Sequence, residues 1–126
     1  MRRKGQPGMY RCIIVDDEEP AVKKLCNVMG KIPIVRICGA YTHSYEAFEA
    51  IKEVNPDLVF LDIEMQEMDG LELACLITEY NPGIDIVFVT AYNKYALEAF
   101  EVHAVDYLLK PVTKQRLEKL MNHIEI

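Results

Sequence analysis

This chain of 126 residues lacks both a membrane-spanning stretch and an export signal. No run of apolar residues approaches the roughly 18 that are needed to cross a bilayer as a helix. The first residues contain no apolar core of the kind that a secretory signal peptide carries. We therefore expect a cytoplasmic location, and a hydrophobic content of 51% in a chain of this length indicates one packed domain.

The chain also lacks an excess of positive charge. Acidic residues outnumber basic ones by 20 to 14, which gives a formal net charge of −6. The one basic cluster, Arg2-Arg3-Lys4, lies at the very start. Because nucleic-acid binding depends on neutralising phosphates, this composition argues against direct binding of DNA or RNA by this domain.

Paired cysteines and clustered histidines are missing as well. No C-x-x-C pair occurs among the four cysteines, which are Cys12, Cys26, Cys38 and Cys75. Each lies in an apolar stretch, so we expect reduced thiols in the core and neither disulfides nor a zinc site. The histidines are isolated too, and we expect surface or half-buried positions for His43, His103 and His123.

What the chain does contain is a regular alternation of apolar strands with amphipathic helices. Strands are predicted at 10–15, 34–40, 58–61, 86–89 and 104–109. Helices are predicted at 20–30, from a cap at Thr42 or Ser44 to 54, at 71–80, in a short segment near 96–100, and from after Thr113 to 124. This pattern indicates an α/β fold with a parallel sheet that helices cover on both faces.

The two ends of the chain carry separate expectations. Residues 1–8 are basic, contain two glycines and a proline, and show no periodicity, so we expect a flexible leader there and the folded domain at 9–126. The chain ends as the last predicted helix finishes, which suits either a complete single-domain protein or the first domain of a longer one.

Charged and hydroxyl side chains follow four of the five predicted strands. Asp16 and Asp17 follow the first strand, Asp62 the third, Thr90 the fourth and Lys110 the fifth. Since the carboxyl ends of parallel strands meet at one edge of the sheet, these five side chains should converge. Taken singly, each has an ordinary interpretation, such as a helix cap, a turn former or a solvated charge. Their shared edge favours a functional site.

Three carboxylates, a hydroxyl and an ammonium group together suit Mg²⁺-dependent phosphoryl transfer. Neighbouring carboxylates repel one another unless a cation lies between them, and Mg²⁺ binds one or two carboxylates while bridging to phosphate. An aspartate can itself attack phosphorus. We assign Asp62 as the nucleophile because it is the central acid of the three and ends the strand expected to be most buried. Asp16 and Asp17 are assigned as metal-binding residues, with Asp17 as the direct ligand and Mn²⁺ as a substitute for Mg²⁺.

The chain resembles the receiver domain of bacterial two-component response regulators, of the CheY-like superfamily. The resemblance covers about 10–124 and is carried by IIVDDEEP at 13–20, VFLDIEMQEMDG at 59–70, FVTAY at 88–92 and DYLLKP at 106–111. It implies a flavodoxin-like, doubly wound sheet of five parallel strands in the order 2-1-3-4-5, with five helices. The segment from 91 to 111 resembles receivers fused to LytTR-type or activator-type transcriptional output domains.

The resemblance also implies a role for each site residue. Asp62 would be the phosphorylation site, and Asp17, Asp62 and the main-chain carbonyl of Glu64 would ligate Mg²⁺, with Asp16 acting through water. Lys110 would contact the phosphoryl group, aimed by a cis peptide bond to Pro111. Thr90 and Tyr107 would form the switch. The ordinary alternative for Tyr107 is a strand tyrosine with an exposed hydroxyl.

One position departs from the usual loop of this family, D-x-x-M-P-x-M-x-G. Gln66 stands where the proline is usual. Because proline restricts φ, its absence predicts a more mobile loop. No predicted ligand is lost, so the departure does not argue against phosphorylation.

The function implied is that of a phosphoacceptor signalling domain with self-catalysed phosphoryl transfer and slow autodephosphorylation, and not that of an enzyme. A sensor histidine kinase would donate the phosphoryl group. The switch would reshape the face of the fourth helix, fifth strand and fifth helix, which is compatible with a homodimer. Control of transcription, and contact with DNA, would require an output domain C-terminal to this chain.

Two other classes of protein share parts of this pattern. A flavin-binding electron-transfer module would need a Ser/Thr/Gly-rich phosphate loop after the first strand, where this chain has four acids at 16–19. An aspartate-nucleophile phosphatase would have a second aspartate two residues after the nucleophile, where this chain has Glu64.

Overall fold

The computed structural model describes residues 10–125, and the leader expected at 1–8 lies outside this range. Ten elements alternate along the chain: β1 (Tyr10–Val15), α1 (Glu19–Met29), β2 (Val35–Tyr41), α2 (Ser44–Val54), β3 (Leu58–Leu61), α3 (Gly70–Tyr80), β4 (Asp85–Thr90), α4 (Ala96–Glu101), β5 (Asp106–Leu109) and α5 (Lys114–Glu125). Between residues 10 and 125, every helix is too short or too polar to cross a membrane.

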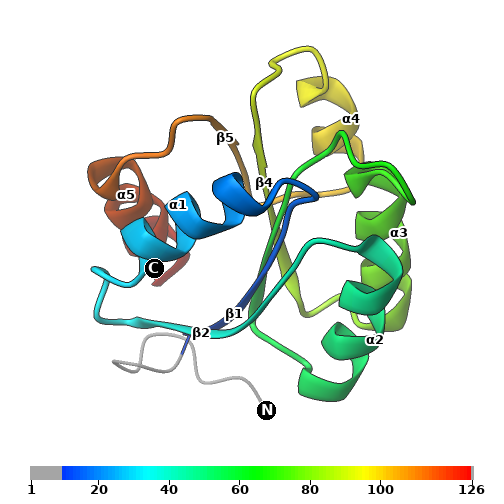
Figure 1. The fold of residues 1–126 in the computed structure, drawn as a ribbon, viewed down its shortest axis with the longest axis horizontal. Coiled ribbons are helices and arrows are strands. Elements are labelled where there is room, and N and C mark those ends of the chain that lie inside the picture. Colours follow the sequence, from blue (N-terminus) through cyan, green and yellow to red (C-terminus); the bar gives the residue numbers. More distant parts are fainter. Residues whose placement is uncertain (1–9, 126) are drawn as a thin grey trace.

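The five strands form one parallel sheet in the order β2-β1-β3-β4-β5, which confirms the predicted topology. Helices α1 and α5 cover one face, and α2, α3 and α4 cover the other (Figure 1). The first strand, β1, lies inside the sheet; the chain then forms the edge strand β2, crosses back to β3 on the other side of β1, and continues through β4 to β5. This change of direction between β1 and β3 leaves a crevice at their carboxyl ends.

The two central strands are buried on both faces. Alternate residues of β1 and β3 enter different apolar clusters: Ile13 and Val59 pack toward α2 and α3, whereas Ile14 and Phe60 pack toward α1 and α5. All of these side chains are at most 1% exposed. This two-sided burial explains why β3 and the Cys12–Val15 part of β1 are continuous apolar runs that do not alternate with polar residues.

Several local expectations are wrong. Neither Thr42 nor Ser44 caps α2; the helix begins after His43, and the Ser44 hydroxyl donates to the carbonyl of Met68 at 2.7 Å. The expected strands at 34–40 and 104–109 are β2 at 35–41 and β5 at 106–109. Cys75 is exposed and not in the core, because the apolar face of α3 turns away from it.

The other cysteine and histidine expectations hold in part. Cys12 is buried, while Cys26 and Cys38 are only half-buried, and all four cysteines are free thiols. The three histidines are exposed, which agrees with the expectation of surface or half-buried positions.

Gly70 lies at the tightest point between β3 and α3. Its N–H donates to the carbonyl of Ile63 at 2.7 Å, which closes the loop that follows Asp62. A Cβ atom built on Gly70 would lie 2.0 Å from the carbonyl oxygen of Asp62. Only glycine therefore allows α3 to begin so close to the end of β3.

We expect Gly70→Ala to lower the free energy of unfolding by at least about 2 kcal/mol, because a clash with main-chain atoms cannot be relieved by a side-chain rotation. Urea denaturation would measure the loss. Gly30→Ala is the matched control, since Gly30 has φ −62° and its Cβ would lie 3.2 Å from the nearest atom. Equal losses in the two variants would contradict the prediction.

Candidate functional site

Three carboxylates meet at the carboxyl edge of the sheet. Asp16 and Asp17 follow β1, and Asp62 follows the neighbouring strand β3, where Val15 pairs with Leu61. Each aspartate offers one oxygen that lies within 4.8 Å of those of the other two. Asp16 and Asp62 are buried, with exposed fractions of 5% and 7%. The strand register therefore brings together the three acids that the sequence placed at this edge.

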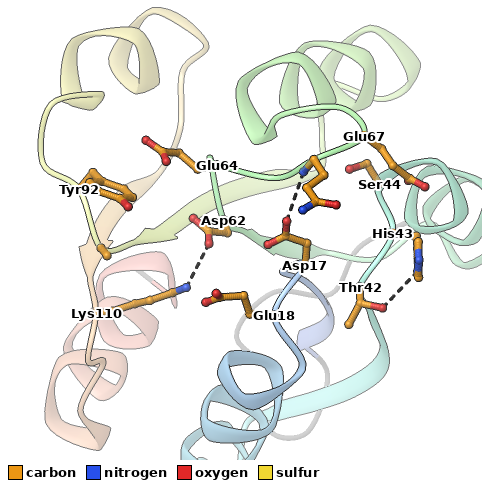
Figure 2. Close-up of a pocket in the computed structure, with 12 residues that line it drawn as sticks. Asp17, Glu18, Thr42, His43, Ser44, Asp62, Glu64, Glu67, Tyr92 and Lys110 are labelled. Atoms are coloured by element: carbon orange, nitrogen blue, oxygen red, sulfur yellow. Dashed lines mark hydrogen bonds and ion pairs between the residues drawn. The ribbon is translucent and has the colours of Figure 1, made fainter.

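Lys110 reaches the cluster from the end of β5. Its Nζ atom lies 2.7 Å from Oδ2 of Asp16 and 3.0 Å from Oδ2 of Asp62. Figure 2 shows the lysine side chain extended across the pocket toward Asp62. The Lys110–Pro111 peptide bond is cis. One ammonium group thus bridges the acids that follow two adjacent central strands.

Main-chain N–H groups also hold each carboxylate. Oδ1 of Asp16 accepts from Glu18 at 3.0 Å, and Oδ1 of Asp62 accepts from Ile63 at 2.6 Å. Oδ2 of Asp17 accepts from Gln66 at 3.2 Å. Each of the three carboxylates is therefore oriented by at least one main-chain donor.

The negative charges of the pocket exceed the positive charge of Lys110, and neighbouring groups change the pKa values of Asp62 and Lys110. Burial raises the pKa of Asp62 above its ordinary value, and the charge of Asp16 adds to the rise, while the hydrogen bonds from Lys110 and Ile63 oppose it. Burial lowers the pKa of Lys110, but its hydrogen bonds to Asp16 and Asp62 outweigh that effect and raise the pKa overall. The lysine is therefore firmly charged, and the carboxylates still repel one another.

This donor set fits a hard divalent cation. Three carboxylates against one ammonium leave a surplus of negative charge, and carboxylate oxygens are the ligands that Mg²⁺ prefers. Asp17 and Asp62 line a cavity of about 540 Å³, together with Thr42, Ser44, Gln66, Tyr92 and Lys110. The cavity leaves room beside the carboxylates for water and for a group that approaches from solvent.

The two predicted switch residues, Thr90 and Tyr107, lie near this pocket but are not part of the aspartate cluster. Thr90 is fully buried, and its hydroxyl accepts a long hydrogen bond from the Tyr92 N–H at 3.4 Å. The Tyr107 side chain is half-buried, and its hydroxyl donates to the main-chain carbonyl of Tyr92. Both residues therefore contact the segment between β4 and α4, which forms one wall of the cavity.

The contacts of the Glu64 side chain could not be predicted from the sequence. Its carboxylate accepts a hydrogen bond of 2.5 Å from the Tyr95 hydroxyl and lies 3.8 Å from Nζ of Lys94. This hydrogen bond raises the pKa of Tyr95 to about 12. No periodicity or motif predicts these contacts, because they depend on the conformation of the segment before α4, which carries Lys94 and Tyr95.

The fold and the acidic pocket define the class: a doubly wound α/β domain with a cluster of three aspartates at the topological switch point. The comparisons then identify the family. Residues 12–122 match the response regulator receiver domain, and the chain belongs to this family.

Relatives and solved structures agree with this assignment. The chain is 47% identical over 117 residues to a response regulatory protein of Yersinia pestis, which covers 92% of this chain. It is 40% identical over 114 residues to the transcriptional regulatory protein BtsR of Escherichia coli K12, covering 90% of this chain. The response regulatory domain of mrkE from Klebsiella pneumoniae superposes with a TM-score of 0.83 at 32% identity, covering 90% of this chain and 93% of that one.

The chain spans about half the length of the curated relatives that it matches, 48% for the Yersinia protein and 47% for BtsR. The comparisons therefore describe the receiver half of those proteins.

We expect Mg²⁺ to stabilise the folded domain, because a cation relieves the repulsion among the three carboxylates. At ten times the dissociation constant, the free energy of unfolding should rise by about 1.4 kcal/mol, which corresponds to a melting temperature about 5 °C higher. Calorimetry at matched ionic strength would measure the shift. Asp17→Asn should lose most of it, and an equal shift in that variant would exclude Asp17 as a ligand.

Proposed function

We propose that this domain receives a phosphoryl group on Asp62 from a phosphohistidine of a sensor histidine kinase, in a reaction that requires Mg²⁺. The observation that carries the proposal is the position of Lys110. Its ammonium group contacts both Asp16 and Asp62, and Asp62 lines a cavity that Asp17 also lines. This is the arrangement needed to bring a negatively charged phosphoryl group to a negatively charged nucleophile.

In the transfer step, a carboxylate oxygen of Asp62 attacks phosphorus. The bond from phosphorus to the kinase imidazole nitrogen breaks, and the histidine leaves and takes up a proton. Asp17, Asp62 and the main-chain carbonyl of Glu64 would hold the metal, with Asp16 acting through water. When bound, the metal neutralises charge on the phosphoryl oxygens.

Lys110 then changes partners. Before the reaction it bridges Asp16 and Asp62, and afterwards it contacts a phosphoryl oxygen on Asp62. Thr90 donates its hydroxyl to another of these oxygens, which requires a movement of the segment between β4 and α4 toward the pocket. Two hydrogen bonds to a charged group supply about 3–6 kcal/mol. A switch from 1:99 to 99:1 requires about 5.5 kcal/mol, which only the upper end of this range reaches, and Lys110 gives up contacts to carboxylates in the exchange.

The movement would alter the face formed by α4, β5 and α5. Tyr107 connects this face to the pocket through its hydrogen bond to the Tyr92 carbonyl. Helix α4 and strand β5 carry exposed apolar side chains, with Leu97 at 68%, Phe100 at 77% and Leu109 at 49%. Phosphorylation would thus control an apolar surface suited to a homodimer or to an output domain.

The wider role we propose is control of transcription from the cytoplasm. It rests on the similarity to BtsR, which is a transcriptional regulatory protein about twice the length of the matched segment. Contact with DNA would come from an output domain, consistent with the net charge of −6 on this chain.

Both alternative classes fit the pocket less well. The acids at 16–19 repel the phosphate of a flavin nucleotide where such a module needs hydrogen-bond donors. For a phosphatase, Glu64 would have to protonate a leaving group, but its carboxylate is engaged by Tyr95 and Lys94 outside the acid cluster.

We expect acetyl phosphate and Mg²⁺ to add a single phosphoryl group, and Asp62→Asn to abolish the addition, because an amide cannot attack phosphorus. Intact-protein mass spectrometry would detect the added mass. Asp69→Asn is the matched control in the same loop, since Asn can still cap α3 at the Glu72 N–H. Undiminished labelling of Asp62→Asn would refute the proposal, and rapid multiple turnover would favour a phosphatase.

We also expect phosphorylation to shift the amide resonances of α4, β5 and α5, because Thr90, Tyr107 and Lys110 all border that face. Heteronuclear NMR spectra of the two forms would show the shifts. The outer face of α2 serves as the internal reference, where little change is expected. Identical α4, β5 and α5 resonances in both forms would rule out this switch surface.

A further inference from the structure

We propose that the main-chain N–H of Gln66 positions Asp17 for metal binding, and that this chain can use that group because residue 66 is not proline. The inference rests on the proposed function, in which Asp17 is a metal ligand. It assigns to Gln66 a role that its exposed side chain does not suggest.

Asp17 differs from the other two acids in what holds it. Asp16 and Asp62 each accept a hydrogen bond from Lys110, and each accepts one from a neighbouring N–H group within two residues. For the Asp17 carboxylate, the hydrogen bond found among residues 10–125 is that from Gln66, which lies 49 positions away in the sequence. Asp17 thus depends on the loop after β3 for its orientation.

The hydrogen bond is compatible with metal binding. With Oδ2 of Asp17 held by Gln66, the three aspartates still present one oxygen each within 4.8 Å of one another. A carboxylate has about four lone-pair sites, so one hydrogen bond leaves others for a cation. The bond therefore keeps Asp17 in the acid cluster, against the repulsion of Asp16 and Asp62.

The loop that carries Gln66 is fixed on both sides. The Gly70 N–H donates to the Ile63 carbonyl, and the Ser44 hydroxyl donates to the Met68 carbonyl. These bonds limit the freedom that the loop gains by lacking a proline. Proline at position 66 would remove the N–H group altogether, so Asp17 would lose this partner.

The test compares Gln66→Pro with Gln66→Ala, which keeps the N–H and removes the side chain. Isothermal titration calorimetry with MgCl₂ measures affinity without any phosphoryl transfer. We expect Gln66→Ala to bind Mg²⁺ within about twofold of the parent, and Gln66→Pro to bind roughly three- to tenfold more weakly, as the loss of one hydrogen bond predicts.

A second measurement separates positioning from a structural role. At saturating Mg²⁺, the rate of Asp62 labelling by acetyl phosphate should be the same in Gln66→Pro and the parent, while the Mg²⁺ concentration for half-maximal rate rises. Damage to the loop would instead lower the saturated rate. Parent-like Mg²⁺ affinity in Gln66→Pro, or equal losses in both variants, would overturn the proposal.

Amide hydrogen exchange keeps the proposal testable even if Gln66→Pro folds poorly. In metal-free protein, Asp17→Ala should speed exchange of the Gln66 N–H several-fold and leave the Gly70 N–H unchanged. Unchanged exchange at Gln66 would overturn the proposal. Failure of the proposed function itself would look different, because the unmodified chain would then take up neither Mg²⁺ nor label.

Discussion

The ammonium group of Lys110 holds the carboxyl edge of this molecule together. It contacts Asp16 and Asp62, two buried carboxylates whose mutual repulsion would otherwise be strong in surroundings of low dielectric constant. A single positive charge cannot balance three negative ones, and Asp17 remains outside its reach as a direct partner. The same arrangement thus permits folding and leaves a site whose remaining charge favours a cation.

The parallel sheet makes this arrangement rigid. β1 and β3 are buried on both faces, so the backbone that carries Asp16 and Asp62 cannot shift without disturbing two apolar clusters. Close packing of α3 against the end of β3, which only Gly70 allows, fixes the loop that follows Asp62. The energy that positions the charged groups therefore comes mainly from apolar burial below them.

In the function we propose, the path from the pocket to the surface is short. Tyr107 lies within β5 and Lys110 directly follows this strand, and Tyr107 contacts the segment that carries Tyr92. Exposed Leu97 and Phe100 lie on the helix that follows this segment. A rearrangement within one hydrogen-bonded loop would therefore reach a surface that a partner can bind.

The sequence by itself determined the apolar core strands and the edge at which Asp62 and Lys110 lie, because these depend on periodicity and on where a strand ends. The strand order followed from the resemblance to the receiver family and not from periodicity. Only the tertiary structure decided which groups touch. The Ser44 hydroxyl donates to the Met68 carbonyl instead of capping its helix, and the Gln66 N–H reaches Asp17 across 49 residues. Such contacts depend on how loops fold back over the sheet, and loop conformation leaves no periodic signal in a sequence.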